Sequence, residues 1–228
     1  DADNVTMRYI LQIYDATGQA SKDPQVKYND GESVNFDVRL VPNRDYRFVV
    51  WADYVESKDD TDFHYNTKDG LTNITLKADT WVAMDETRDA FTGVFNTAED
   101  GNKTPYNGAK DIDITLTRPF AKLRVITTDM EQLNDLNIIP TKATVQYHAD
   151  YDHYNAFNAF EGKAIANSKN RDITHEKFTI KAYDDNVDDE SMVLFTDYFF
   201  AADQEEVVKF NLSVYDQDNA IIGKTINF

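Results

Sequence analysis

The sequence contains no cysteine. This absence excludes thiol catalysis, thiolate metal sites and disulfide bonds, and with them the class of small disulfide-stapled domains. Basic residues are also scarce, since 23 lysines and arginines stand against 41 aspartates and glutamates and give a formal net charge of −18. A chain of that charge repels phosphate backbones and anionic lipid head groups. Nucleic acid is therefore not expected as a partner.

Long hydrophobic runs are missing too. No window approaches the roughly 18 uninterrupted apolar residues of a membrane-spanning helix, so no transmembrane segment is expected. The chain opens at Asp1 without an initiator methionine or the apolar core of a signal peptide, and we expect a mature form whose targeting segment has been removed. Acidity, abundant tyrosine and asparagine, and the lack of cysteine favour an exported bacterial protein.

The sequence does contain enough apolar material for real cores, because 41% of its 228 residues are hydrophobic and 13% are aromatic. Much of this material alternates with polar residues, which is the pattern of half-buried strands. The clearest cases are 34–40 and 208–214, whereas 46–54 is apolar on both faces and predicts a doubly covered central strand. With about ten such segments and a single short helical candidate, the chain is predicted to be all-β.

A change of phase around Pro119 indicates how the strands are divided. Even-numbered positions are apolar up to Leu116, whereas odd-numbered positions are apolar from Ala121 onward, so the buried face must swap. Proline cannot donate to a sheet ladder, which suits a crossing between sheets. Residues 1–117 and 118–228 are accordingly predicted to form two tandem β-sandwich domains.

Other features of the chain are weaker. Long polar stretches at 55–69, 78–109 and 150–171 are predicted to be surface loops on this scaffold. A short internal echo relates 10–18 to 211–219, since each ends a strand in Tyr-Asp before a turn. It carries little weight alone, because any strand that ends in a tight turn can produce such a match.

Two clusters look like metal sites and are better explained as solvated loops. His148, Asp150, Asp152 and His153 combine imidazole with carboxylate, but strand geometry would turn His153 away from the other three. The acidic run 184–190 lacks the glycine and glutamate that shape an EF-hand loop. No metal and no cofactor is therefore expected.

Catalytic motifs are missing as well. The sequence has no Gly-x-Ser-x-Gly elbow, Walker loop, His-Glu-x-x-His helix or dinucleotide fingerprint. Carboxylates are so frequent that a pair of them does not single out a glycosidase. The protein is not expected to be an enzyme.

Exposed aromatic rings could bind sugars, because pyranose faces stack on them. Tyr151, Tyr154 and Phe157 lie in an irregular stretch and are the candidates for such a surface. Trp51 lies in the doubly apolar strand and is expected in the core. The competing explanation for the irregular stretch is a loop that packs onto its own sandwich.

Three motifs occur in a suggestive order: Asp45-Tyr-Arg-Phe-Val-Val-Trp-Ala-Asp53, Asp85-Glu-Thr-Arg-Asp-Ala-Phe-Thr-Gly93 and Leu116-Thr-Arg-Pro-Phe-Ala-Lys-Leu-Arg-Val125. Together they resemble the fimbrillin-like proteins of Bacteroidales, the subunits and accessory proteins of type V pili. The resemblance covers most of the first half and the crossover. It implies two transthyretin-like β-sandwiches, export as a lipoprotein, and a place at the outer membrane or in a fimbrium.

The resemblance also implies a mode of assembly. In that family a protease removes the first strand of the N-terminal domain, and a strand from a neighbouring subunit fills the apolar groove that is left. The chain would then be a fimbrial subunit or accessory subunit with an adhesive role, and its partners would be other fimbrial subunits and a host protein or glycan. It departs from the family in having no lipid-bearing cysteine and no preceding strand with an arginine cleavage site.

The motif residues are assigned to the scaffold and not to chemistry. The expected core anchors and junction residues are Trp51, Phe91, Pro119 and Phe120, and the expected partners for buried carboxylates are Arg88 and Arg118. Two alternatives stay open at this point. One is a glycan-binding surface lipoprotein that uses the aromatic residues near 151–160, and the other is a host-interaction module that does not polymerise.

Overall fold

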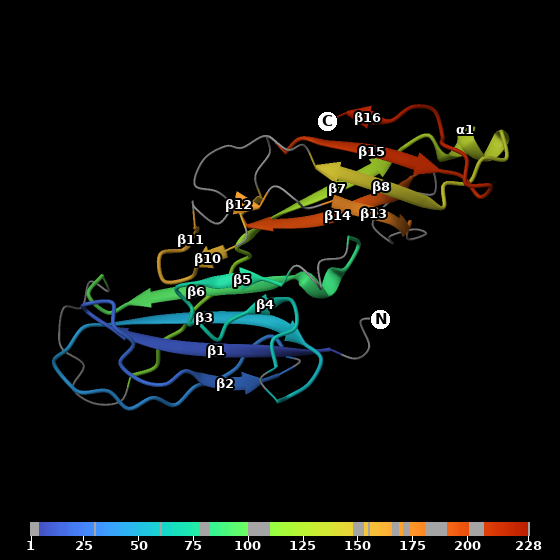
Figure 1. The fold of residues 1–228 in the computed structure, drawn as a ribbon. Coiled ribbons are helices and arrows are strands. Elements are labelled where there is room, and N and C mark those ends of the chain that lie inside the picture. Colours follow the sequence, from blue (N-terminus) through green and yellow to red (C-terminus); the bar gives the residue numbers. More distant parts are fainter. Residues whose placement is uncertain are drawn as a thin grey trace. The chain divides into compact units, whose positions relative to one another are not determined.

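The computed structural model describes residues 5–29, 31–59, 61–77, 83–99, 110–147, 153–154, 156–165, 169–170, 174–180, 191–200 and 208–227. Almost all of the regular structure in these residues is strand, arranged in antiparallel sheets (Figure 1). The exceptions are the six-residue helix α1 (Met130–Asp135) and a single 3-10 turn at Glu86–Arg88. The all-β class predicted from the alternation of the sequence is confirmed.

The chain forms two compact units. The first comprises Asp1–Trp81, Glu86–Phe120 and Asn155–Ile165, and the second comprises Val82–Asp85, Ala121–Tyr154 and Ala166–Phe228. One passage between them follows Phe120, close to the phase change in the sequence. The single boundary predicted between residues 117 and 118 does not describe this division, however, because residues 155–165 belong to the first unit although they follow part of the second in the sequence.

The first unit is built on a central sheet with the strand order β2-β1-β3-β6. Its strands are β1 (Thr6–Asp15), β2 (Gln25–Tyr28), β3 (Tyr46–Val55) and β6 (Ala90–Asn96). Strands β1 and β3 pair over their whole length, from Thr6 opposite Val55 to Asp15 opposite Tyr46. Both strands are buried on both faces, as the two-sided apolar pattern of 46–54 indicates.

One face of the central sheet packs against a second sheet with the order β11-β10-β5-β4. Its short strands are β4 (Tyr65–Asn66), β5 (Ile74–Leu76), β10 (Ala156–Asn158) and β11 (Lys163–Ala164). Trp51 is fully buried here, with ring centroids 5.4 Å from Tyr65 and 6.3 Å from Phe157. Because β10 pairs with β5, the segment 155–165 belongs to this core, although it lies far away in the sequence.

The same core holds a buried ionic cluster. Arg8 donates from Nε and Nη2 to the two carboxylate oxygens of Asp53, at 2.9 and 2.8 Å, and its Nη1 lies 2.9 Å from Oδ1 of Asp62. Arg8 and Asp53 are both 0% exposed. Since a charge is buried only at high cost unless it is paired and hydrogen-bonded, this cluster ties β1 to β3 and to the loop that carries Asp62.

The second unit has a sheet with the order β13-β8-β15-β16 and a pair formed by β14 and β7. The strands are β7 (Phe120–Thr127), β8 (Lys142–Tyr147), β13 (Thr174–Thr179), β14 (Met192–Phe200), β15 (Phe210–Tyr215) and β16 (Ile226–Asn227). A short pair joins β9 (His153–Tyr154) to β12 (Lys169–Asn170). Aromatic side chains fill the core, where the Tyr147 ring contacts Phe195, Phe199 and Phe210.

The internal echo of the sequence corresponds to the same hairpin in both units. In β1–β2 a carboxylate oxygen of Asp15 accepts the N–H groups of Thr17 and Gln19, and in β15–β16 Asp216 accepts those of Asp218 and Ala220. The left-handed position is Gly18 in the first hairpin (φ 80°) and Asn219 in the second (φ 63°). These residues adopt positive φ at low cost and allow the tight turn.

Candidate functional site

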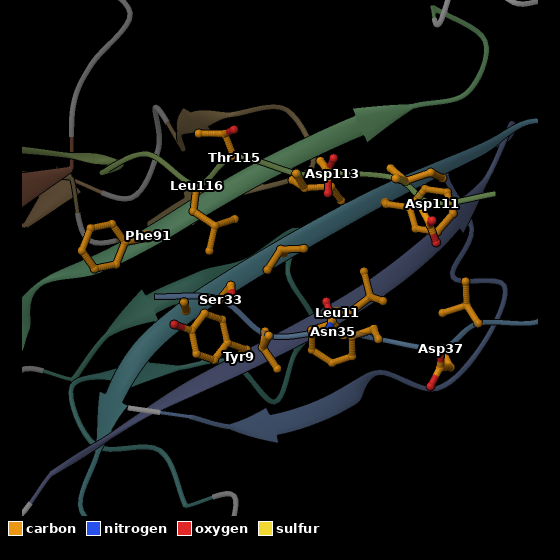
Figure 2. A pocket seen from close by; sticks show the side chains of 18 of the residues that line it. Tyr9, Leu11, Ser33, Asn35, Asp37, Phe91, Asp111, Asp113, Thr115 and Leu116 are labelled. Atoms are coloured by element: carbon orange, nitrogen blue, oxygen red, sulfur yellow. The ribbon is translucent and has the colours of Figure 1, made fainter. Parts of the chain in front are cut away.

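In the part of the chain that the structure describes, no sheet covers the other face of the central sheet in the first unit. Two extended segments lie over it instead: flank A (residues 31–41), which precedes β3, and flank B (residues 110–117), which precedes β7. Between them is a groove of about 1810 Å³ whose floor is formed by β1 and β3 (Figure 2). This groove is the candidate functional site.

Each flank has the side-chain pattern of a strand. In flank A the inward side chains are half-buried while the intervening residues are exposed, and flank B repeats this pattern. The inward residues pack against a core cluster of Leu11, Ile13, Tyr46, Phe48 and Val50; they are Phe36, Val38 and Leu40 of flank A and Ile112, Ile114 and Leu116 of flank B. The alternation predicts strands at both places, and the structure shows the extended conformation without a strand ladder.

The main-chain groups at the outer edge of each flank have hydrogen-bond partners. In flank A the carbonyl oxygen of Asn35 accepts from Lys27 Nζ at 2.5 Å, and those of Ser33 and Arg39 also accept from side chains. In flank B the N–H and the carbonyl of Thr117 both pair with Thr92 of β6, at 2.9 and 2.8 Å. All of these bonds involve odd-numbered residues of the flanks.

The inner edges of the flanks are different. Successive residues of an extended chain direct their N–H and C=O groups to opposite edges, so the even-numbered residues direct theirs toward the groove. Across the described ranges no hydrogen bond involves the main chain of residues 34, 36, 38 and 40 or of residues 112, 114 and 116. The groove therefore lies between two strand-like edges whose main-chain groups have no protein partner, which is the property of an open sheet edge.

Gly93 of β6 allows flank B to lie close to the sheet. A Cβ atom at this position would be 2.7 Å from the carbonyl oxygen of Thr115 and 2.8 Å from side-chain atoms of Ile114 and Leu116. No other residue type fits without moving flank B. The position of one groove edge thus depends on a single glycine.

The proposed scaffold residues lie around this unit. Phe120 is 9% exposed, and its ring contacts Trp51 and Tyr65. Pro119 is buried directly before the first residue of β7, where its missing N–H removes no ladder bond. Phe91 lines the groove.

The two arginines of the motifs differ in exposure. Arg118 donates to both carboxylate oxygens of Asp89, with its Nη2 2.7 Å from Oδ2, and its guanidinium lies 5.0 Å from the centre of the Phe91 ring. Its side chain is 56% exposed. Arg88 is 2% exposed, and its carbonyl accepts the hydroxyl of Tyr65. Arg118 thus joins the end of flank B to the residue before β6, whereas Arg88 contacts Tyr65 of β4, and neither arginine lines the groove.

The aromatic candidates for sugar binding need one correction. Phe157 is 3% exposed and packs against Trp51, because β10 holds it in the core of the first unit. It is therefore not part of an exposed platform. Tyr151 lies outside the described residues, and for Tyr154 only the strand assignment of the backbone is described.

The two metal-like clusters fall largely outside the described residues. This applies to His148, Asp150, Asp152 and the run 184–190, while His153 is described only as part of β9. Among the side chains that the structure describes, no group of three His, Asp or Glu residues is arranged to hold a metal ion. Within the same part of the chain, no helix is long and apolar enough to cross a membrane.

Sequence reasoning did not find the groove as a site. The alternation at 34–40 and 112–116 was visible, but it predicts a strand and cannot tell whether the strand has neighbours. Lys22, Lys27 and Asn29, which precede flank A, bind its outer carbonyls and mark only the outer edge, so no side-chain pattern marks the inner edges that face the groove.

Comparison with known proteins gives a family and a fold. The family model described as "Family of unknown function (DUF6562)" matches residues 1–228, and the chain belongs to this family. No curated protein matches the sequence. Among solved structures, the chain is similar to the crystal structure of a "putative adhesin" from Bacteroides thetaiotaomicron, with 12% sequence identity and a TM-score of 0.51; the match covers 97% of this chain and 71% of the other. At that identity the likeness shows a shared fold alone.

Proposed function

We propose that this protein is a structural or adhesive component of the bacterial cell surface whose first unit accepts an extended strand from another protein. It would act as a fimbrial subunit or accessory subunit, without catalytic activity, and its partners would be other subunits at the outer membrane or in a fimbrium. The observation that carries the proposal is the groove between two edges with unpaired main-chain groups. The fold shared with a protein described as an adhesin of Bacteroides agrees with a surface role.

The size of the groove favours a peptide over a small molecule. Pockets for small molecules have volumes of roughly 300–1,000 Å³, whereas this groove has about 1810 Å³. The inward positions of flank A extend from residue 34 to residue 40, a length of about 20 Å at 3.3 Å per residue. An extended segment of about seven residues matches that length.

The main chain of the groove favours a strand over other peptide conformations. An inserted strand could exchange hydrogen bonds with the even-numbered residues of both flanks and join them into one sheet. Its inward side chains would pack between the half-buried side chains of the two flanks, over the buried floor of Leu11, Phe48 and Val50. A helix would satisfy its own backbone and leave both edges unpaired. Strand addition therefore supplies both the hydrogen-bond partners of the two edges and apolar contacts within the groove.

Hydrogen exchange of the amides in the flanks tests this proposal. In the isolated protein we expect fast exchange at residues 34, 36, 38 and 40, because their N–H groups have no partner. In material purified as an assembly from the native cell surface, these amides should be protected. Equal and fast exchange in both samples would refute strand addition at this groove.

A pair of neighbouring substitutions provides the control. Val38→Asn places a polar group at an inward position, whereas Arg39→Asn changes an outward and exposed one. We expect the first variant to be lost from surface assemblies in immunoelectron microscopy and the second to be incorporated. The free energy of unfolding of both isolated variants should be measured, so that a folding defect is not mistaken for lost assembly.

A further inference from the structure

The outward side chains at the rim of the groove are acidic at its centre. Figure 2 shows that the flanks run in opposite directions, with Asp111 opposite Asp37 and Asp113 opposite Asn35. Asp37, Asp111 and Asp113 are exposed, and none of them has an ion pair in the described structure. Three carboxylates therefore face the space that an inserted strand would occupy.

The cations of the flanks lie toward one end of the groove. Arg39 follows Asp37 and Lys110 precedes Asp111, so in antiparallel flanks both lie beyond the Asp37 and Asp111 pair. Lys22 and Lys27 bind carbonyls on the outer edge of flank A, on the side away from the groove. At the other end of flank A the charged residue is Glu32. Among the residues that the structure describes, the centre of the rim thus has no positive charge of its own.

We propose that the groove selects a basic amphipathic strand, with apolar residues at its inward positions and lysine or arginine at its outward positions. This inference rests on the proposed function and adds the chemistry of the partner. In a sheet, directly opposed side chains on one face interact, and opposite charges stabilise the pairing while like charges destabilise it. An outward lysine between Asp37 and Asp111 would have a carboxylate on each side. An outward glutamate there would face two like charges.

The C-terminal segment of this chain does not have this pattern. In 221–227 the residues Ile222, Lys224 and Ile226 share one face, so Lys224 would enter the apolar floor whenever the two isoleucines did. The opposite register places Ile221, Gly223 and Thr225 inward, which supplies only one large apolar side chain to the groove. Residues 221–227 of a second copy are therefore not the preferred occupant, which is a basic amphipathic strand from a partner protein.

Three labelled peptides binding to the whole chain test the inference by fluorescence anisotropy. The first is acetyl-Val-Lys-Val-Lys-Val-Lys-Val-amide, the second has glutamate in place of lysine, and the third has serine in place of valine. The third measures general attraction of a cationic peptide to a chain with a net charge of −18. We expect the Val-Lys peptide to bind about ten-fold more tightly than the Val-Glu peptide at low salt, on the scale of two or three cross-strand charge pairs. The difference should shrink at high salt.

Variants of the rim localise the effect. The triple variant Asp37→Asn, Asp111→Asn, Asp113→Asn should bring the affinities of the Val-Lys and Val-Glu peptides within about two-fold of each other. The matched control is a triple variant of exposed acids in the second unit with the same change of net charge, namely Glu131→Gln, Asp135→Asn and Asp218→Asn. This control should leave the ten-fold difference almost unchanged.

The outcomes separate the inference from the proposed function. If both valine peptides bind equally and more tightly than the serine peptide, the groove accepts a strand but does not select its charge, and the inference is wrong. If neither valine peptide binds better than the serine peptide, strand acceptance itself fails and the inference fails with it. If the control triple variant removes the preference as fully as the rim variant, the selection comes from net charge and not from the groove.

Discussion

Removing the guanidinium of the buried ionic cluster should destabilise the first unit more than any surface change. In Arg8→Met the two-pronged contact with Asp53 and the contact with Asp62 disappear, and the new side chain is apolar and of similar length. The carboxylate of Asp53 then stays buried without a counter-charge. Breaking a buried pair in this way costs about 3–5 kcal/mol, a large part of the roughly 5–15 kcal/mol that stabilises a typical native protein.

The matched control is an ion pair of similar length on the surface of the same unit. Lys163 Nζ lies 2.9 Å from Glu161 Oε2, and both side chains are about half exposed, at 47% and 48%. Exposed pairs contribute roughly 0–1 kcal/mol, because water competes for both charges. Lys163→Met should therefore change the free energy of unfolding by no more than about a third of the Arg8→Met effect.

Denaturant unfolding followed by tryptophan fluorescence measures the difference. Trp51 is 0% exposed in the core next to the cluster, so in a Trp81→Phe background its emission reports the first unit alone. The slope of the free energy against denaturant should be unchanged if both variants unfold from the same native state. An Arg8→Met effect no larger than that of Lys163→Met would refute the argument.

The pH dependence supplies a second check on the cause. Burial raises the pKa of Asp53, and the Arg8 guanidinium opposes that rise. Without Arg8 the pKa of Asp53 in the folded state should lie higher still. A group whose pKa is raised on folding contributes stability below its unfolded pKa, which is about 3.9 for aspartate, and that contribution is lost as pH rises through the folded value. The deficit of Arg8→Met relative to the parent should therefore grow with rising pH.

Three further predictions concern Gly93 beside the groove, segment 155–165 and the β1–β2 hairpin. Gly93→Ala should destabilise the first unit by about 1–3 kcal/mol in thermal unfolding, because its Cβ would overlap flank B; Gly31→Ala, whose Cβ would meet only a flexible side chain, is the control. Phe157→Ala should lower the free energy of unfolding by about 3–5 kcal/mol, because the ring is buried. A loss as small as that of an exposed side chain would show that segment 155–165 is not part of the core. The Thr17 hydroxyl lowers the pKa of Asp15 most, and main-chain N–H groups of the turn lower it further. The stabilisation of the turn by the Asp15 carboxylate should therefore be lost as pH falls through this lowered pKa. NMR titration of Thr17→Val should show a higher pKa of Asp15 than in the parent.

The sequence predicted the parts of the fold that depend on local alternation. The two-sided apolar pattern of 46–54 indicated a central strand, and β3 is buried on both faces. The change of phase at Pro119 indicated a boundary there, and one of the passages between the two units follows Phe120, although the units do not divide at a single point. Both patterns can be recognised within a few residues, because successive side chains of a strand point to opposite faces.

The parts that could not be predicted depend on pairing between distant segments. Nothing near Phe157 shows that β10 will pair with β5, some eighty positions earlier in the chain. Its aromatic neighbours left two explanations open, an exposed sugar-binding surface and a loop that packs onto its own sandwich, and the burial of Phe157 agrees with the second. The pattern 34–40 likewise shows which side chains point inward but not whether the strand has a neighbour on each edge. Unpaired main-chain groups carry no side-chain signature, so the groove becomes visible only in three dimensions.

The repeated hairpin explains how an unpaired segment can stay extended beside the groove. In the first unit the hairpin carries Lys22 and Lys27, whose ammonium groups bind outer carbonyls of flank A and satisfy one of its edges. In the second hairpin the position that corresponds to Lys22 is Gly223, which has no such donor. The same backbone is thus used twice, and in the first copy the hairpin side chains also hold flank A in place from one edge. Because its outer edge is held, flank A is already ordered while its inner edge stays available. Less conformational entropy is therefore lost when a partner strand binds.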